Sequence, residues 1–123
     1  MVLSGKPFYL TAEEETWVYE CLAAMDERTK TGQLFCVMGG DYTIEEIKQL
    51  VREEGIGAVL FRPCSKSELI EKYAALDAAA KVPLLHAANL EEGGAGGISD
   101  GTYFANQLGG AAAADEGCPR HLP

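Results

Sequence analysis

The residues of this sequence that could carry out chemistry gather in one stretch, where an apolar run leads into a loop rich in glycine and acid. Asn89, Glu91 and Glu92 follow the apolar run 82–88, and Asp100 comes at the end of the glycine-rich part. Carboxylates with different pKa values can do acid–base work, and they also accept hydrogen bonds from sugar hydroxyls. Because adjacent residues of an extended segment point to opposite sides, we expect at most one of Glu91 and Glu92 to face a ligand. A solvated acidic turn is the alternative interpretation.

Two further charged residues take equivalent positions after earlier apolar runs. Asp41 follows the run 33–38, and Arg62 follows the run 57–61. The carboxyl ends of parallel strands meet at one edge of a sheet, so both side chains could face the same site as the loop after the third apolar run. An ordinary surface charge explains either residue equally well.

Other chemical signals favour structure over catalysis. His86 lies inside the run 84–88, a position more typical of a hydrogen-bonded core histidine than of a catalyst, and no Ser or Cys nucleophile stands in an elbow motif near it. The loop 93–99 lacks the third glycine of G-x-G-x-x-G and carries acid that would repel phosphate. We therefore expect no nucleotide site and no cofactor.

The elements that position these residues follow from capping boxes and apolar periodicity. The nearly continuous apolar run 33–38 suits a strand covered on both faces, and 26–31 is expected to be a turn or a second short helix. Strand centres roughly 25 residues apart, with a helix in each gap, fit right-handed βαβ crossovers, which predicts an α/β fold with a parallel sheet. The expected helices are 12–25, 44–54 and the segment from the Ser65 cap to about Lys81, and the expected strands are 33–38, 57–61 and 84–88.

Composition limits the class of protein and its partners. The 123 residues allow one domain, and a hydrophobic fraction of 47% with 24% charged residues is ordinary for a globular chain. Ten basic against nineteen acidic residues give a net charge of -9, which repels nucleic acid and anionic membrane surfaces. Neither a secretory signal nor an apolar run of membrane length is found.

The cysteines favour a reducing compartment. Cys21, Cys36, Cys64 and Cys118 form no C-x-x-C pair and no Cys/His group at metal spacing, so we expect no metal site. Cys21 and Cys36 stand among apolar neighbours and are expected to be buried free thiols. The cytoplasm is the expected location.

The organised sequence ends near Leu108. We divide the chain into an ordered portion, 1–108, and an irregular tail, 109–123. A three-stranded parallel sheet would have open edges, so either further strands should follow or a homo-oligomer should form through an exposed edge.

The order and spacing of five segments resemble the opening of family 3 glycoside hydrolases, in the branch of β-N-acetylhexosaminidase and β-glucosidase-like enzymes. The match extends over about 11–108. The segments are Gly32-Gln33-Leu34-Phe35, Gly55 to Arg62, Ala78 to Leu85, Asn89 to Gly94, and Asp100 to Phe104.

This resemblance implies the first three βα units of a (β/α)8 barrel, preceded by an N-terminal helix. It also implies a family of enzymes whose members hydrolyse O-glycosyl bonds of β-linked sugars with retention of configuration. In these enzymes a covalent intermediate forms on an Asp of a late strand. That region is not present, so we expect a truncated member without catalytic residues, inactive by itself.

The resemblance also bears on sugar contacts. The family's Asp-x-Glu-Gly-Gly motif matches at Glu92, Gly93 and Gly94, but Leu90 stands at the Asp position. The expected substrate-binding residues are Asn89, Glu92, Asp100, Arg62 and Asp41, with a carbohydrate as partner. The alternative function is a non-catalytic carbohydrate-binding or assembly module that oligomerises through the open sheet edge.

Overall fold

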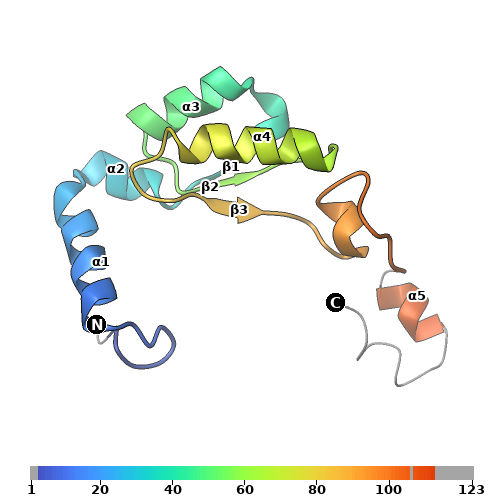
Figure 1. Ribbon diagram of the computed structural model, residues 1–123, viewed down its shortest axis with the longest axis horizontal. Helices are drawn as coiled ribbons and strands as arrows, with labels where there is room; N and C mark the ends of the chain where they lie inside the picture. The colour runs from blue at the N-terminus through green and yellow to red at the C-terminus, as the bar shows by residue number, and fades with distance from the viewer. Residues whose placement is uncertain (1–2, 106, 113–123) are drawn as a thin grey trace.

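The computed structural model describes residues 3–105 and 107–112, which form an α/β arrangement around three short strands (Figure 1). In chain order the elements are α1 (Ala12–Ala24), α2 (Glu27–Gly32), β1 (Cys36–Met38), η1 (Gly39–Asp41), α3 (Ile44–Glu53), β2 (Ala58–Leu60), α4 (Lys66–Asp77), β3 (Leu85–Ala87), η2 (Gly93–Gly96) and α5 (Gln107–Ala112).

The three strands form one parallel sheet in the order β1-β2-β3. Val37 pairs with Val59, and Val59 pairs with His86. Helix α3 connects β1 to β2, and α4 connects β2 to β3, as βαβ crossovers require. The α/β class and the parallel sheet predicted from the sequence are therefore confirmed.

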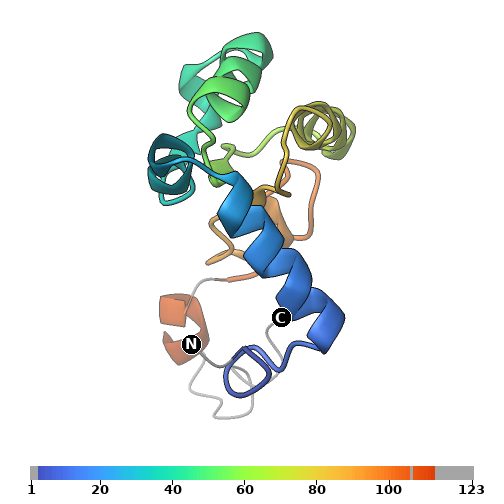
Figure 2. The same ribbon diagram turned by 90° about the vertical axis from the view of Figure 1, so that its left-hand side faces the viewer.

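Helices α3 and α4 pack on one face of the sheet, which we call the covered face (Figures 1 and 2). Ile47 of α3, Val59 of β2 and Leu76 of α4 are each 0% exposed. Burying an aliphatic side chain of this size contributes roughly 1.5–3 kcal/mol, so this layer is the main source of stability. The core cluster is completed by Val51, Ile56, Phe61 and Leu84.

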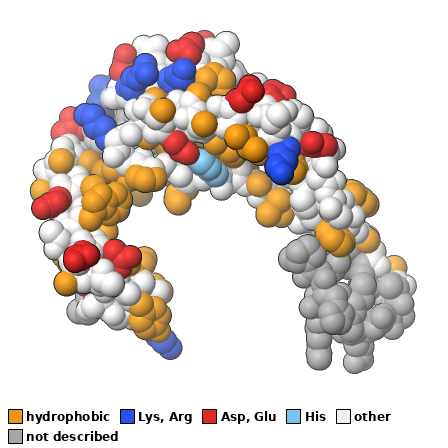
Figure 3. Space-filling model, in the orientation of Figure 1, with side chains coloured by type: hydrophobic (Ala, Val, Ile, Leu, Met, Phe, Trp, Pro, Cys, Tyr) orange, Lys and Arg blue, Asp and Glu red, His pale blue; other side chains and the backbone are white. Residues whose placement is uncertain are grey.

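The opposite face of the sheet, which we call the open face, carries no described element (Figures 1 and 2). Strand side chains alternate between the faces, so Met38 is 39% exposed and Leu85 is 72% exposed. Apolar side chains accordingly gather along the concave side of the molecule in Figure 3. The prediction that the run 33–38 is covered on both faces is wrong for the described residues, because the helices cover only one face. Cys36 is exposed for this reason, whereas Cys21 is half-buried.

The predicted helix starts are confirmed by their caps. Thr11 and Thr43 each accept a hydrogen bond from the backbone N–H three residues later, and Glu14 and Glu46 complete both capping boxes. The backbone N–H and hydroxyl groups of Thr11 and Thr43 donate to the carboxylates of Glu14 and Glu46, which lowers the pKa of both carboxyls. At α4, Ser65 caps the helix by accepting from the Glu68 N–H.

Helix α4 ends at Asp77, earlier than the predicted Lys81. The Ala80 N–H donates to the carbonyls of both Leu76 and Asp77, which closes the last turn. Pro83 also disfavours helical backbone at the residue before it. Residues 78–82 therefore turn the chain toward β3.

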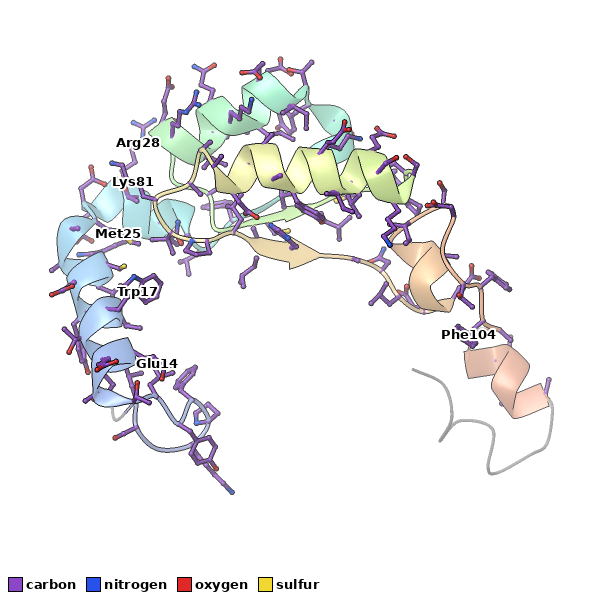
Figure 4. All side chains as sticks on the ribbon, in the orientation of Figure 1. Glu14, Trp17, Met25, Arg28, Lys81 and Phe104 are labelled. Carbon is purple, nitrogen blue, oxygen red and sulfur yellow. The ribbon has the colours of Figure 1, made fainter. Side chains whose placement is uncertain are left out.

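The two helices before the sheet differ in packing. The segment 26–31 forms the short helix α2, capped by Asp26, which agrees with one of the two predicted alternatives. In the described part of the chain, none of the residues of α1 is buried. Trp17 is 50% exposed and points from α1 toward the concave side (Figure 4).

The C-terminal end differs from the irregular tail expected over 109–123. Helix α5 extends to Ala112, so the first four residues of that tail are helical, and 113–123 lie outside the described residues. Among the helices described, none has both the length and the apolar composition needed to span a membrane.

Candidate functional site

An open hollow of about 600 Å³ lies at the carboxyl ends of the strands, and we call it the carboxyl-end hollow. The ends of β1 and β2 form part of its wall, and the loop that follows β3 forms another part. Ligand sites of parallel α/β sheets occur at this edge. The residues that line it are Met38, Leu60, Phe61, Arg62, Pro63, Asn89, Glu91, Glu92, Gly96 and Leu108.

The loop after β3 is fastened to the connection between β2 and α4. The Ser99 N–H donates to the Cys64 carbonyl at 2.8 Å, and Cys64 forms a parallel bridge with Ile98. The Asp100 carboxylate accepts a hydrogen bond from the Lys66 N–H at 2.8 Å. These contacts hold the loop beside Arg62 and bring two strand ends to one hollow.

Glycines allow the loop to fold closely on itself. Gly93 has φ +78°, and a Cβ there would lie 2.3 Å from Phe104 Cδ2. A Cβ on Gly96 would lie 1.8 Å from the carbonyl oxygen of Asn89. Side chains at these two positions would therefore displace the loop. Phe104 lies where the chain leaves this loop (Figure 4).

Glu91 and Glu92 are both among the residues that line the hollow, and the expectation that at most one of them faces a ligand stays a prediction. The Gly93 N–H donates to the Leu90 carbonyl at 3.0 Å, so the two glutamates occupy the centre of a turn. Alternation of side chains holds for extended backbone and does not apply in a turn. The pattern Glu-Glu-Gly-Gly is the sequence signal that could have indicated this turn.

The structure brings together three of the five predicted site residues. Arg62, Asn89 and Glu92 line the carboxyl-end hollow. Asp41 lies in η1, after β1, and does not line it. Asp100 also lies outside the lining, where it accepts the hydrogen bond from α4 described above.

The charges of the hollow are available to a ligand. Within the described residues, Arg62, Glu91 and Glu92 form no ion pair. The two carboxylates accept hydrogen bonds, the Arg62 guanidinium donates them, and the Asn89 amide can do both. This set of groups suits a ligand with several hydroxyls.

His86 points to the covered face, away from the hollow. Its Nε2 lies 3.0 Å from Asp77 Oδ1, and its ring stacks on Tyr73 with centroids 3.7 Å apart. Burial raises the pKa of the Tyr73 hydroxyl. The interpretation of His86 as a hydrogen-bonded structural residue agrees with these contacts, although the ring is exposed at the edge of the core.

A second, smaller cavity of about 150 Å³ lies at the other end of the sheet, between α1, α2, the C-terminal end of α3 and the residues that follow α4. Gln33 Nε2 donates to the Gly55 carbonyl at 2.6 Å in its wall. Nearby, Arg28 pairs with Glu54, which raises the pKa of the guanidinium and lowers that of the carboxyl. These groups satisfy one another and join the helices.

The chain is similar to known sugar-processing enzymes. It is 33% identical, over 110 residues, to a protein of Cellulomonas fimi named beta-N-acetylglucosaminidase/beta-glucosidase, with 89% of this chain and 20% of that protein covered. No protein-family model matches the chain.

Solved structures of the beta-glucoside phosphorylase BglX share its fold. The structure bound to 2FGlc has a TM-score of 0.78 and 37% identity, and covers 94% of this chain and 21% of that one. Another BglX structure has a TM-score of 0.76 and 38% identity, with 94% of this chain and 20% of that one covered. The chain thus spans about a fifth of the length of the relatives it matches.

Proposed function

We propose that this chain, which is related over most of its length to part of the family 3 glycoside hydrolases, forms one wall of a site that binds a β-linked sugar. The observation that carries the proposal is the carboxyl-end hollow, where Arg62, Asn89 and Glu92 meet. Barrel enzymes place their active sites at this edge of the strands.

Each polar group has a distinct part in this proposal. Glu92, the glutamate of the family motif, accepts hydrogen bonds from sugar hydroxyls. Arg62 and Asn89 donate to the sugar oxygens from the neighbouring strand ends. Leu90, at the motif's Asp position, does not line the hollow and contributes no polar contact.

The substrate class that we propose is a β-glucoside, because glucosidase and glucoside phosphorylase activities both appear in the relatives' names. An N-acetylhexosaminide is the finer possibility, supported by the name of the Cellulomonas fimi protein. We further propose that the bond-cleaving groups belong to the larger part of the relatives that this chain does not span. The cytoplasm remains the proposed location, supported by the free thiols of Cys21, Cys36 and Cys64.

Titration of the 15N-labelled chain with methyl β-D-glucoside tests the sugar site. We expect shifts of the amide signals of Asn89, Glu92 and Gly93, and we expect Arg62→Ala to weaken binding about tenfold through loss of a charged hydrogen bond. Arg52→Ala, an exposed arginine of α3 outside the hollow, is the matched control. Shifts that are absent, or spread without relation to the hollow, would contradict the proposal.

A non-catalytic carbohydrate-binding or assembly module is the second candidate function. The open face favours it, because the exposed apolar side chains Met38 and Leu85 could be covered by a second copy. Both functions can use the same hollow, so they differ in what contacts the open face.

A further inference from the structure

An apolar groove of about 320 Å³ lies between α1 and the residues that lead into β1 and β3, and we call it the α1 groove. Helix α1 forms one wall, and the other wall lies at the amino-terminal ends of the strands. Leu34 is 86% exposed and Trp17 is 50% exposed, so the described residues leave the groove open. The apolar side chains that line it are Trp17, Val18, Leu22, Met25, Leu34 and Val82.

Unpaired carboxylates of α1 flank this groove. The helix contains four glutamates and neither lysine nor arginine. Glu13 and Glu20 lie about one helical turn from Trp17. Glu15 lies within one turn of Val18. Within the described residues, none of these three carboxylates forms an ion pair. The rim of the groove therefore carries negative charge beside apolar surface, and Figure 3 shows both kinds of side chain on this arm of the molecule.

Helix α3 is also acidic, but its charges have partners within the chain. Glu45 pairs with Lys48 at 2.7 Å, and Glu46 completes a capping box. In the α1 groove the charged residue of the lining, Lys30, pairs with Glu27 at 3.1 Å, so it leaves the other glutamates of this region unpaired. Open apolar surface together with unpaired carboxylates thus distinguishes α1 from α3.

This combination complements a helix that is apolar on one side and basic along its flanks. Helix α1 is about 20 Å long, so a partner helix of similar length can lie along it. A second copy of this chain is a poor complement, because its own α1 would bring further carboxylates to the rim. An anionic membrane surface is repelled for the same reason.

We propose that the α1 groove is a docking site for a basic amphipathic helix of a partner protein. The apolar stripe of that helix covers Trp17 and Leu34, and its lysines or arginines pair with the carboxylates of α1. This docking site is independent of the sugar site, because the α1 groove and the carboxyl-end hollow lie at opposite ends of the strands and share no lining residue.

Trp17 is the only tryptophan in the sequence, so its fluorescence reports directly on the groove. The full chain is titrated with three synthetic peptides of the length of α1. The first is a Leu/Lys peptide with leucines at helical spacing, the second has the same composition in scrambled order, and the third carries Glu in place of Lys. We expect the first peptide to shift the Trp17 emission to shorter wavelength and to bind at least about tenfold more tightly than the other two.

Variants of the groove test the two parts of this recognition. Leu34→Ser should weaken binding of the first peptide about tenfold through loss of apolar contact, and the exposure of Leu34 leaves the fold intact. Glu13→Gln combined with Glu20→Gln should weaken binding about threefold and reduce its dependence on salt. The matched controls are Ile70→Ser and Glu71→Gln, two exposed residues of α4 outside the groove, and neither should change the affinity.

Each contrary result overturns a stated part of the proposal. Equal binding of the scrambled peptide would overturn recognition of an amphipathic helix, and equal binding of the acidic peptide would overturn charge complementarity. Equal effects of Leu34→Ser and Ile70→Ser would show that the peptide does not dock in the groove. A Trp17 emission that shifts with protein concentration alone would assign the groove to a second copy. A larger shift with vesicles of neutral phospholipid than with the basic peptide would assign it to a membrane surface.

Discussion

The two faces of the same sheet have nearly the same apolar character but opposite environments. On the covered face Val59 is 0% exposed, and on the open face Leu85 is 72% exposed. The contrast appears even between neighbours along the chain, since Leu84 is 8% exposed and Leu85 follows it directly. Apolar sequence creates the potential for burial, and the packing partner decides whether burial occurs.

Two helices show the same contrast. Both α1 and α3 begin with a Thr-x-x-Glu capping box of the same geometry. Helix α3 buries Ile47 and Val51, whereas in the described part of the chain α1 buries none of its residues. A cap fixes where a helix begins, but tertiary packing provides most of its stability.

The largest effect is expected from Leu76→Ala in the layer between α4 and the sheet. Leu76 is 0% exposed, so its truncation should leave a cavity and lower the free energy of unfolding by about 2–5 kcal/mol. Urea unfolding followed by circular dichroism would measure this loss. A reduction below about 1 kcal/mol would mean that the covered face is not a packed core.

A smaller effect distinguishes α3 from α1. Thr43→Ala removes the side-chain acceptor of the Glu46 N–H and should cost about 1 kcal/mol in the urea unfolding of the whole core. The matched change Thr11→Ala should instead raise amide hydrogen exchange locally in α1 and leave core unfolding nearly unchanged. Equal effects of the two changes on core unfolding would show that α1 is coupled to the core.

Most of the architecture was predictable because it depends on local patterns. Thr11 and Thr43 mark helix starts by residue type, Gly55 takes a positive φ just after α3, and the strand spacing implies parallel crossovers. The family resemblance depends on the order of short segments. It is confirmed by relatives that are 33% and 37% identical to this chain over most of its length.

The remaining features depend on contacts that a sequence pattern does not specify. The alternating rule assumed extended backbone for Glu91 and Glu92, whereas Gly93 closes a turn around them. The apolar run 33–38 is the same whether one face or two are covered, so the exposure of Cys36 could not be deduced from it. Parallel topology placed Arg62 beside Asn89 at the hollow, but the same argument was applied to Asp41, which does not line it.

The smallest effect on stability is expected from Leu85→Ala on the open face, although the chemical change is the same as in Leu76→Ala. Because Leu85 is already exposed, its truncation should change the free energy of unfolding by no more than about 0.5 kcal/mol. Its effect should appear in association, since the variant removes apolar surface that a second copy could cover.

Size-exclusion chromatography over a range of concentrations would measure this association. If the wild-type chain forms a discrete dimer that Leu85→Ala dissociates, the open face is an interface between copies and the assembly module gains support. If the chain is monomeric and Leu85→Ala only lowers binding of an apolar dye, the open face is uncovered in solution, and the sugar-site proposal stands without self-association.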